Sequence, residues 1–554
     1  MSAELRGTPA APGVAIAAPW VYDAVPAGAT SRLPLPEAAA LAADEVVGIA
    51  TRLRDQGREA EAEIFDAQSL MARDPALHDA TVALMADGTD AAIAVVQAGE
   101  AVAVSFEEIG DEVLAARGAD VRDITARIAR IMTGAFVPRL ERRSVVVAAD
   151  LPPSVTVELD RALLVGIALE GGSRTSHAAI LARSLGIPAV VGVVGVREAA
   201  ATAVELAVDG DAGVVHVDPD AETLAHLAVI TEVAQARAGH DTELASADLA
   251  TSDGHRVTCA ANIGDPADAA AAFAAGAEAI GLFRTEFAFA GRTTAPDEAV
   301  QAAAYTEVLR ASAGAEVVFR LADIGGDKPI SYLPIEPEAN PFLGVRAIRL
   351  HDRHPELLPM QLRAILRASA DAGRRASIMA AMVADESDLD LVLRLIADAR
   401  AAVPAAPVPR IGVMIEVPSA VLLADRLAPR VDFMSIGTND LTQYLLAADR
   451  SNAALAARQD PLHPAVLRAV SRVVEAAAPT NCGVAVCGEM AADPVGALLL
   501  IGLGVDELSM EPRSFGAVKG AVGARTLPDL VALAVRAQLM PSGADVRRAV
   551  ELGA

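Results

Sequence analysis

The segment RIGVMIEVPSAVLLADRLAPRVDFMSIGTNDLTQYLL (410–446) alternates between short apolar runs and helical patterns. The runs at 411–417 and 432–437 predict buried strands, and the amphipathic stretch between them predicts a helix. The same alternation extends outward in both directions, to strand-like runs at 257–263, 279–285, 316–322, 378–383 and 484–488, with a short eighth candidate at 344–348. Eight such units predict a (β/α)8 TIM barrel over residues 251–554, and an open doubly wound sheet is the alternative because periodicity does not reveal closure.

The first half of the chain has a different pattern. Residues 35–134 carry apolar residues at helical spacing, whereas short apolar runs bounded by Gly, Pro and Asp follow residue 138. We therefore expect an α/β domain formed by residues 1–22 and 138–220, with a helical bundle inserted at 23–137. Residues 221–250 read as a helical linker to the barrel.

Composition excludes several classes of protein. The 554 residues include 73 acidic and 46 basic ones, so the net charge of −27 argues against a nucleic-acid binder or a protein that docks on anionic membranes. Three cysteines in so long a chain form no disulfide framework, and we find no signal peptide or spanning segment. We expect a soluble, cytoplasmic α/β protein.

The stretch GGSRTSHAAILARSLGIPAVVG (171–192) places a histidine at the start of a helix. Thr175 and Ser176 are good N-cap residues, and Gly186 is a good C-terminal stop. His177 therefore falls in the first turn, where unpaired backbone N–H groups and the helix dipole favour an anion. A neutral imidazole there can attack a phosphoryl group, and a polar surface histidine is the alternative.

Polar side chains stand where the predicted barrel strands end. Because the active sites of such barrels lie at the carboxyl ends of the strands, we expect these side chains to meet at one mouth. They are Arg284, Arg320, Glu416, Asn439, Asp440 and Cys487, and Arg450 follows shortly after Asp440.

The chemistry of this set is complementary. The three guanidiniums suit phosphate and carboxylate groups, and Glu416 and Asp440 suit a magnesium ion. Cys487 could act as a nucleophile or as an acid, whereas surface salt bridges, helix caps and a buried hydrophobic cysteine are the alternatives. With no Walker A or GxGxxG sequence, the pattern predicts phosphoryl transfer from an enol phosphate to His177.

The motifs also resemble a known family, enzyme I of the bacterial phosphotransferase system (phosphoenolpyruvate–protein phosphotransferase), over nearly the whole chain. The histidine segment resembles the phosphohistidine signature of that family. The motifs similar to its barrel follow in the same order: FRTEF, DIGGDKP, NPFLGVRAIR, MIEVPSA, SIGTNDLTQY, AADRSN and CGEMA.

The resemblance implies a role for each site residue. His177 would be phosphorylated on Nε2, and Cys487 would protonate the enolate. Phosphoenolpyruvate would be held by Arg284, Arg320, Asn439, Asp440 and Arg450, and Mg²⁺ by Glu416 and Asp440.

The resemblance also implies partners. The segments AEIFDAQSLMARDP (62–75) and FEEIGDEVLAARGADVRDI (106–124) are similar to the part of the family that docks the carrier protein HPr. A homodimer through the barrel is likewise implied. Two other functions stay open: a lyase-type barrel acting on phosphoenolpyruvate or oxaloacetate with a regulatory N-terminal half, and a non-catalytic scaffold.

Overall fold

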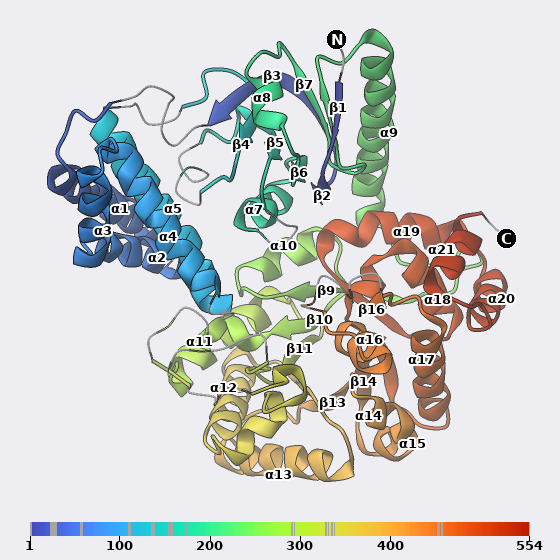
Figure 1. Ribbon diagram of the computed structural model, residues 1–554. Helices are drawn as coiled ribbons and strands as arrows, with labels where there is room; N and C mark the ends of the chain where they lie inside the picture. Colours follow the sequence, from blue (N-terminus) through green and yellow to red (C-terminus); the bar gives the residue numbers. More distant parts are fainter. Residues whose placement is uncertain are drawn as a thin grey trace. The chain divides into compact units, whose positions relative to one another are not determined.

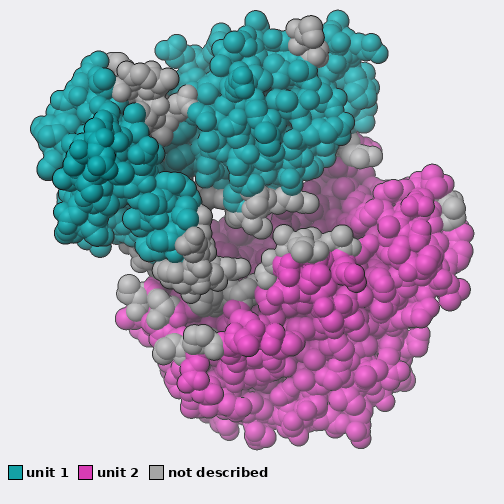
Figure 2. All heavy atoms as spheres, viewed as in Figure 1, with its two compact units in different colours: residues 1–237 teal, residues 238–554 magenta. Residues whose placement is uncertain are grey.

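A computed structural model of the chain divides into two compact units, Met1–Arg237 and Ala238–Ala554 (Figure 2). The structure describes residues 3–22, 30–55, 59–108, 112–134, 139–152, 155, 159–172, 176–289, 292, 294–326, 330, 332–333, 336, 338–450, 452, 455 and 458–552.

The first unit contains an eight-stranded sheet in the order β1-β8-β7-β3-β4-β5-β6-β2 (Figure 1). Strands β3 and β4 are parallel neighbours although the whole helical insertion separates them in sequence, so the insertion leaves the sheet intact. Helices α7 (His177–Leu185) and α8 (Val196–Ala200) accompany the sheet. The strands are β1 (Ala3–Arg6), β2 (Thr8–Ala11), β3 (Val14–Tyr22), β4 (Ser144–Ala148), β5 (Leu164–Leu169), β6 (Ala189–Val191), β7 (Leu206–Asp209) and β8 (Val214–Val217).

The insertion is a helical bundle whose core is built from small and branched residues. Ala38, Ala42 and Val46, at helical spacing on its first helix, are completely buried. Its helices are α1 (Leu35–Asp55), α2 (Glu59–Met71), α3 (Pro75–Ala86), α4 (Ala91–Glu108) and α5 (Glu112–Thr133). Helix α9 (Ala221–Ala245) follows the sheet, and the division between the two units falls inside it, after Arg237.

The second unit is a closed barrel of eight parallel strands, which confirms the predicted TIM barrel over the open sheet. Buried Val, Ile, Leu and Met residues dominate the strands, as parallel strands covered on both faces require. The strands are β9 (Thr258–Ile263), β10 (Ala279–Arg284), β11 (Val317–Arg320), β12 (Ser377–Ala380), β13 (Arg410–Ile415), β14 (Phe433–Ile436), β15 (Gly483–Val486) and β16 (Glu507–Met510).

The eighth-strand candidate at 344–348 is wrong. The short helix η3 (Ala347–Asp352) begins within it, and Ala347 has a φ of 50°, which an extended strand does not allow. The eighth strand is β16, which pairs with β15 on one side and closes the barrel against β9 on the other.

Helices surround the barrel strands in Figure 1. Their apolar faces join the strands in one continuous core. No helix among the described residues is both long enough and apolar enough to cross a membrane. The helices are α10 (Asp268–Ala274), α11 (Glu298–Ala311), α12 (Leu357–Ala372), α13 (Glu386–Ala402), α14 (Pro418–Leu422), α15 (Ala424–Leu427), α16 (Thr438–Leu446), α17 (Pro464–Ala477), α18 (Pro494–Gly502), α19 (Phe515–Gly523), α20 (Leu527–Ala537) and α21 (Gly543–Glu551).

Candidate active site

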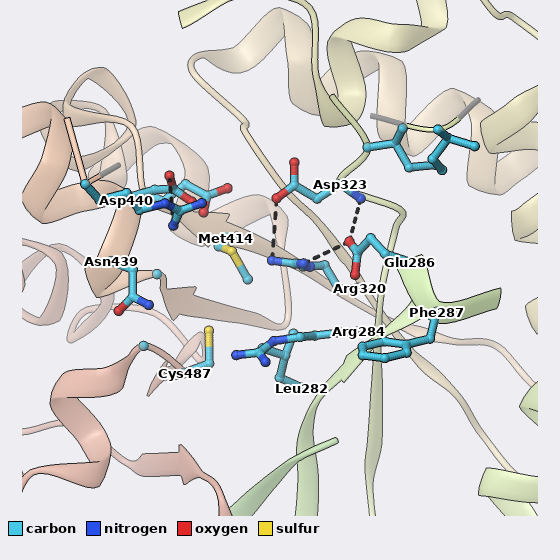
Figure 3. A pocket seen from close by; sticks show the side chains of 16 residues that line it. Leu282, Arg284, Glu286, Phe287, Arg320, Asp323, Met414, Asn439, Asp440 and Cys487 are labelled. Carbon is cyan, nitrogen blue, oxygen red and sulfur yellow. Dashed lines mark hydrogen bonds and ion pairs between the residues drawn. The ribbon is translucent and has the colours of Figure 1, made fainter. Parts of the chain in front are cut away.

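A pocket of about 520 Å³ lies at the carboxyl end of the barrel strands (Figure 3). The structure brings together all seven barrel residues singled out in the sequence, because strands β10, β11, β13, β14 and β15 end or lead into loops there. Those seven are Arg284, Arg320, Glu416, Asn439, Asp440, Arg450 and Cys487.

Arg320, the last residue of β11, is almost fully buried and is held by carboxylates. Its Nη2 donates to Oε1 of Glu286 at 2.8 Å, and Oδ2 of Asp323 lies 3.7 Å from its Nη1 (Figure 3). Burial lowers the pKa of Arg320, but Glu286 and Asp323 outweigh burial and raise that pKa above its ordinary value. The guanidinium is therefore a fixed positive charge in the pocket.

Behind the pocket lies an arginine that the sequence analysis did not select. Arg346 is completely buried, and its Nε and Nη2 donate to the two carboxylate oxygens of Asp323 at 3.0 and 2.6 Å. Its Nη1 and Nη2 also reach Asp440 at 3.3 and 3.4 Å. Arg346 thus orients a carboxylate of the pocket from behind. The signal in the sequence was an arginine inside the apolar run GVRAI, where burial of the side chain would require an ion pair.

Glu416 follows β13 and is 1% exposed. Its Oε1 accepts a hydrogen bond from the backbone N–H of Met382 at 2.7 Å. Burial, followed by repulsion from Asp440 and Asp323, raises the pKa of Glu416 to about 7, although Arg320 opposes this shift. The site therefore concentrates negative charge that a cation would relieve.

Glu416 and Asp440 fit a hard divalent cation. Both offer carboxylate oxygens in the same pocket, and a cation bound there would relieve the repulsion that Asp440 exerts on Glu416. Among the described residues, no group of three or more His, Cys, Asp or Glu side chains is arranged to hold a metal. A magnesium ion, which keeps several waters and also binds substrate oxygens, suits such a small ligand set.

Cys487 lies directly after β15 and is 4% exposed. Burial raises the pKa of its thiol to about 11, while the Ser435 hydroxyl and the charge of Arg320 act in the opposite direction. The thiol is therefore protonated at neutral pH, which suits an acid better than a nucleophile. Cys259 and Cys482 are buried as well, as expected of cysteines with a packing role.

Asn439 and Arg450 lie on the helical side of the mouth. The Asn439 side chain donates to Oε1 of Glu489 at 3.2 Å and accepts from the Glu489 backbone N–H at 2.9 Å. Arg450 lies 3.7 Å from Oδ1 of Asp440, and its guanidinium stacks 5.0 Å above the ring of Phe342. Both side chains are therefore anchored by neighbours at the pocket rim.

In the other unit, His177 is the first residue of helix α7, as the sequence predicted. Ser176 is the N-cap, and its hydroxyl accepts from the backbone N–H of Ala179 at 3.4 Å. Gly186 ends the helix with a φ of 66°. The imidazole of His177 and residues 173–175 lie outside the part of the chain that the structure describes.

Three family descriptions match successive parts of this chain. "PEP-utilising enzyme, N-terminal" matches residues 6–117, and "PEP-utilising enzyme, mobile domain" matches residues 140–213. "PEP-utilising enzyme, PEP-binding domain" matches residues 239–526, slightly more than half of the chain. The three matches follow the order of bundle, sheet and barrel.

Curated relatives match over most of this chain. A phosphoenolpyruvate-protein phosphotransferase of Haloferax volcanii is 40% identical over 93% of the chain and 91% of its own length. One of Bacillus subtilis is 36% identical over 83% and 82%, respectively. A multiphosphoryl transfer protein of Xanthomonas campestris is 41% identical over 88% of the chain, which spans only 58% of that longer protein. The chain therefore belongs to the phosphoenolpyruvate-protein phosphotransferase family of PEP-utilising enzymes.

Proposed function

We propose that this protein transfers the phosphoryl group of phosphoenolpyruvate first to its own His177 and then to the carrier protein HPr, the first step of the sugar phosphotransferase system. One observation carries the proposal. Seven residues that resemble family site residues, selected in the sequence from five strand ends and the segment after one of them, line a single pocket.

The pocket chemistry supports a phosphorylated carboxylate as substrate. Arg284, Arg320 and Arg450 offer guanidinium donors that match phosphate and carboxylate oxygens in pairs. Asn439 adds an amide at the same mouth. Positioning and electrostatic stabilisation account for most of the catalysis in phosphoryl transfer, and a set of fixed charges supplies both.

The balance of charge supports a magnesium requirement. Among the described lining residues, three arginines face four carboxylates, so the pocket does not attract a highly charged anion by net charge alone. Glu416 and Asp440 would hold the ion, which when bound would neutralise phosphoryl oxygens. The arginines would still fix the orientation of the substrate.

The remaining residues complete a balanced reaction. Nε2 of His177 forms a bond to phosphorus while the bond from phosphorus to the enol oxygen breaks, and the enolate leaves with the electron pair. The Cys487 thiol then gives its proton to C3 of the enolate, which yields pyruvate. The raised pKa of Cys487 supports this role because the thiol carries its proton at neutral pH.

The second transfer concerns the other unit. By family membership, the bundle α1–α5 would dock HPr, which then takes the phosphoryl group from His177. We further propose a homodimer through the barrel and a cytoplasmic location. Helix α9, inside which the two units divide, is the candidate hinge between the two transfers.

Incubation with phosphoenolpyruvate carrying a labelled phosphoryl group, together with Mg²⁺, tests the proposal. We expect acid-labile label on the wild-type protein and none on His177→Ala, whereas His226→Ala, at an exposed position of helix α9, should still be labelled. Carbon–carbon cleavage without a labelled protein would favour the lyase. No loss of phosphoenolpyruvate would favour a scaffold.

A further inference from the structure

An asparagine that contacts the pocket residue Cys487 bridges three consecutive strands of the barrel. Asn262 lies near the end of β9, and its Nδ2 donates to the backbone carbonyl of Cys487 at 3.0 Å. The same Nδ2 donates to the backbone carbonyl of Ser509, on β16, at 3.1 Å. One side chain thus ties the residue after β15 to the seam where β16 and β9 close the barrel.

The orientation of this amide is fixed by a third hydrogen bond. The hydroxyl of Ser509 donates to Oδ1 of Asn262 at 2.7 Å. A flipped amide would turn its oxygen toward two carbonyl oxygens and its NH₂ group toward the hydroxyl, losing both carbonyl bonds. Ser509 is completely buried, so the hydroxyl is held in place by packing.

Asn262 supplies one of two opposite restraints on the Cys487 backbone. On the other side, the N–H of Cys487 donates to the carbonyl of Ile436, on β14, at 3.2 Å. The next residue, Gly488, packs so closely on Thr438 that a Cβ there would overlap the threonine hydroxyl. The two peptide groups that flank the thiol are therefore held directly from β14 and by Asn262 of β9, and Ser509 of β16 acts on them through Asn262.

We propose that Asn262 is a positioning residue for proton transfer by Cys487, with the Ser509 hydroxyl holding its amide in the required orientation. The inference deepens the proposed function and rests on the role of Cys487 within it. Proton transfer to carbon requires the thiol within hydrogen-bond reach of C3, and a displacement of about 1 Å lowers such a rate by up to about 100-fold.

A purely structural role for Asn262 makes a different prediction. If Asn262 served only to close the barrel seam, its substitution would weaken folding and lower every activity of the pocket alike, whether or not the Cys487 thiol is present. Positioning acts through Cys487 alone, so its effect disappears once the thiol has been removed. A double-mutant cycle therefore separates the two roles.

The experiment measures the steady-state kcat for pyruvate formation and the KM for phosphoenolpyruvate in Asn262→Leu, Cys487→Ala and the double variant. We expect Asn262→Leu to lower kcat by about 10- to 100-fold with KM little changed. In the Cys487→Ala background the same substitution should change the residual rate by less than about twofold. Circular dichroism with thermal unfolding shows whether each variant is folded.

Ser509→Ala provides a milder second variant if Asn262→Leu does not fold. It removes only the hydroxyl that orients the amide, and we expect a fall in kcat of about two- to fivefold that again vanishes without the thiol. A loss of the same size in both backgrounds, with Cys487→Ala itself slow, overturns the positioning role and leaves the proposed function standing. Wild-type turnover by Cys487→Ala overturns the positioning role together with the acid role of Cys487, whereas the proposed transfer to His177 fails only if that residue is not labelled.

Discussion

The buried guanidinium of Arg346 gives the sharpest test of how this pocket is held together. Replacing it in Arg346→Met keeps most of the apolar stem but removes the fork that pairs with both oxygens of Asp323, at 3.0 and 2.6 Å. Asp440 loses two longer contacts at the same time. Asp323 is completely buried, so its charge stays away from water.

The expected loss follows from that geometry. Removing one partner of a buried ion pair lowers the free energy of unfolding by about 3–5 kcal/mol. Because Arg320 still lies 3.7 Å from Asp323, part of the charge remains compensated, and we expect about 3 kcal/mol. The substitution should also lower turnover because Asp440 is no longer oriented.

Urea unfolding measures this loss, and the chain supplies an internal reference. Trp20, the single tryptophan, lies on β3 in the first unit, so its fluorescence follows that unit, whereas tyrosine fluorescence also samples the barrel. The barrel transition of Arg346→Met should move to lower urea while the Trp20 transition stays in place. The matched control is Arg349→Met. Arg349 is more exposed and donates to the backbone carbonyls of Leu343 and Gly344, so its replacement should cost less than about 1 kcal/mol.

A shift of the barrel transition by less than about 1 kcal/mol would refute this reasoning. It would mean that the two carboxylates, Asp323 and Asp440, can be buried side by side without the guanidinium of Arg346. An equal shift of both transitions would show instead that the two units unfold as one.

Three other predictions test the charges of the barrel. Burial, followed by repulsion from Glu316, raises the pKa of Glu507 from 4.5 to about 7. The native state therefore loses stability as the pH rises from about 4.5 to 7. Glu507→Gln should raise the free energy of unfolding by about 1–3 kcal/mol at about pH 8 and very little near pH 4.5. Glu511→Gln, at an exposed position, is the control. An equal rise in the free energy of unfolding of Glu507→Gln at both pH values would contradict the raised pKa of Glu507. Because the pKa of Cys487 is raised to about 11, its alkylation by iodoacetamide, followed by mass spectrometry, should keep rising above about pH 9, and a plateau by about pH 8 would be inconsistent with burial. Glu416→Gln should raise the Mg²⁺ concentration for half-maximal phosphorylation of His177 by about tenfold or more, and an unchanged requirement would remove Glu416 from the proposed ligand set.

Much of the barrel was predictable because strands of a parallel sheet are buried on both faces. Seven of its apolar runs carry their own boundary signals, and the observed strands lie within them or differ by a few residues. Strand β16 was missed because Glu507 and Ser509 make half of it polar. Both side chains fill space left by Gly281, a compensation between strands far apart in sequence that no local pattern reveals.

In the pocket, too, local sequence patterns reveal some residues, and others are brought in only by long-range folding. Six of its seven predicted lining residues follow from one rule, that functional side chains stand at strand carboxyl ends, and Arg450 follows helix α16 nearby in the sequence. Asp323 and Arg346, which the sequence did not predict, come from loops whose paths depend on the finished fold. Asp323 follows β11, Arg346 precedes a short helix, and only burial in a common core brings them within 2.6 Å of each other.

The predicted lining residues and the buried ion pairs around them have different electrostatic roles in the site. An acidic protein with a net charge of −27 must bind an anion, and a bare cluster of arginines in its core would repel itself. The carboxylates of Glu286 and Asp323 make the buried guanidiniums of Arg320 and Arg346 tolerable, since each accepts hydrogen bonds from an arginine at under 3 Å. This pairing leaves three arginines against four carboxylates in the described lining, so recognition would rest on the direction of the donors and on the cation proposed at Glu416 and Asp440 more than on net charge. With the proposed cation bound, such a pocket would favour a ligand that carries both a phosphate and a carboxylate over a simple anion.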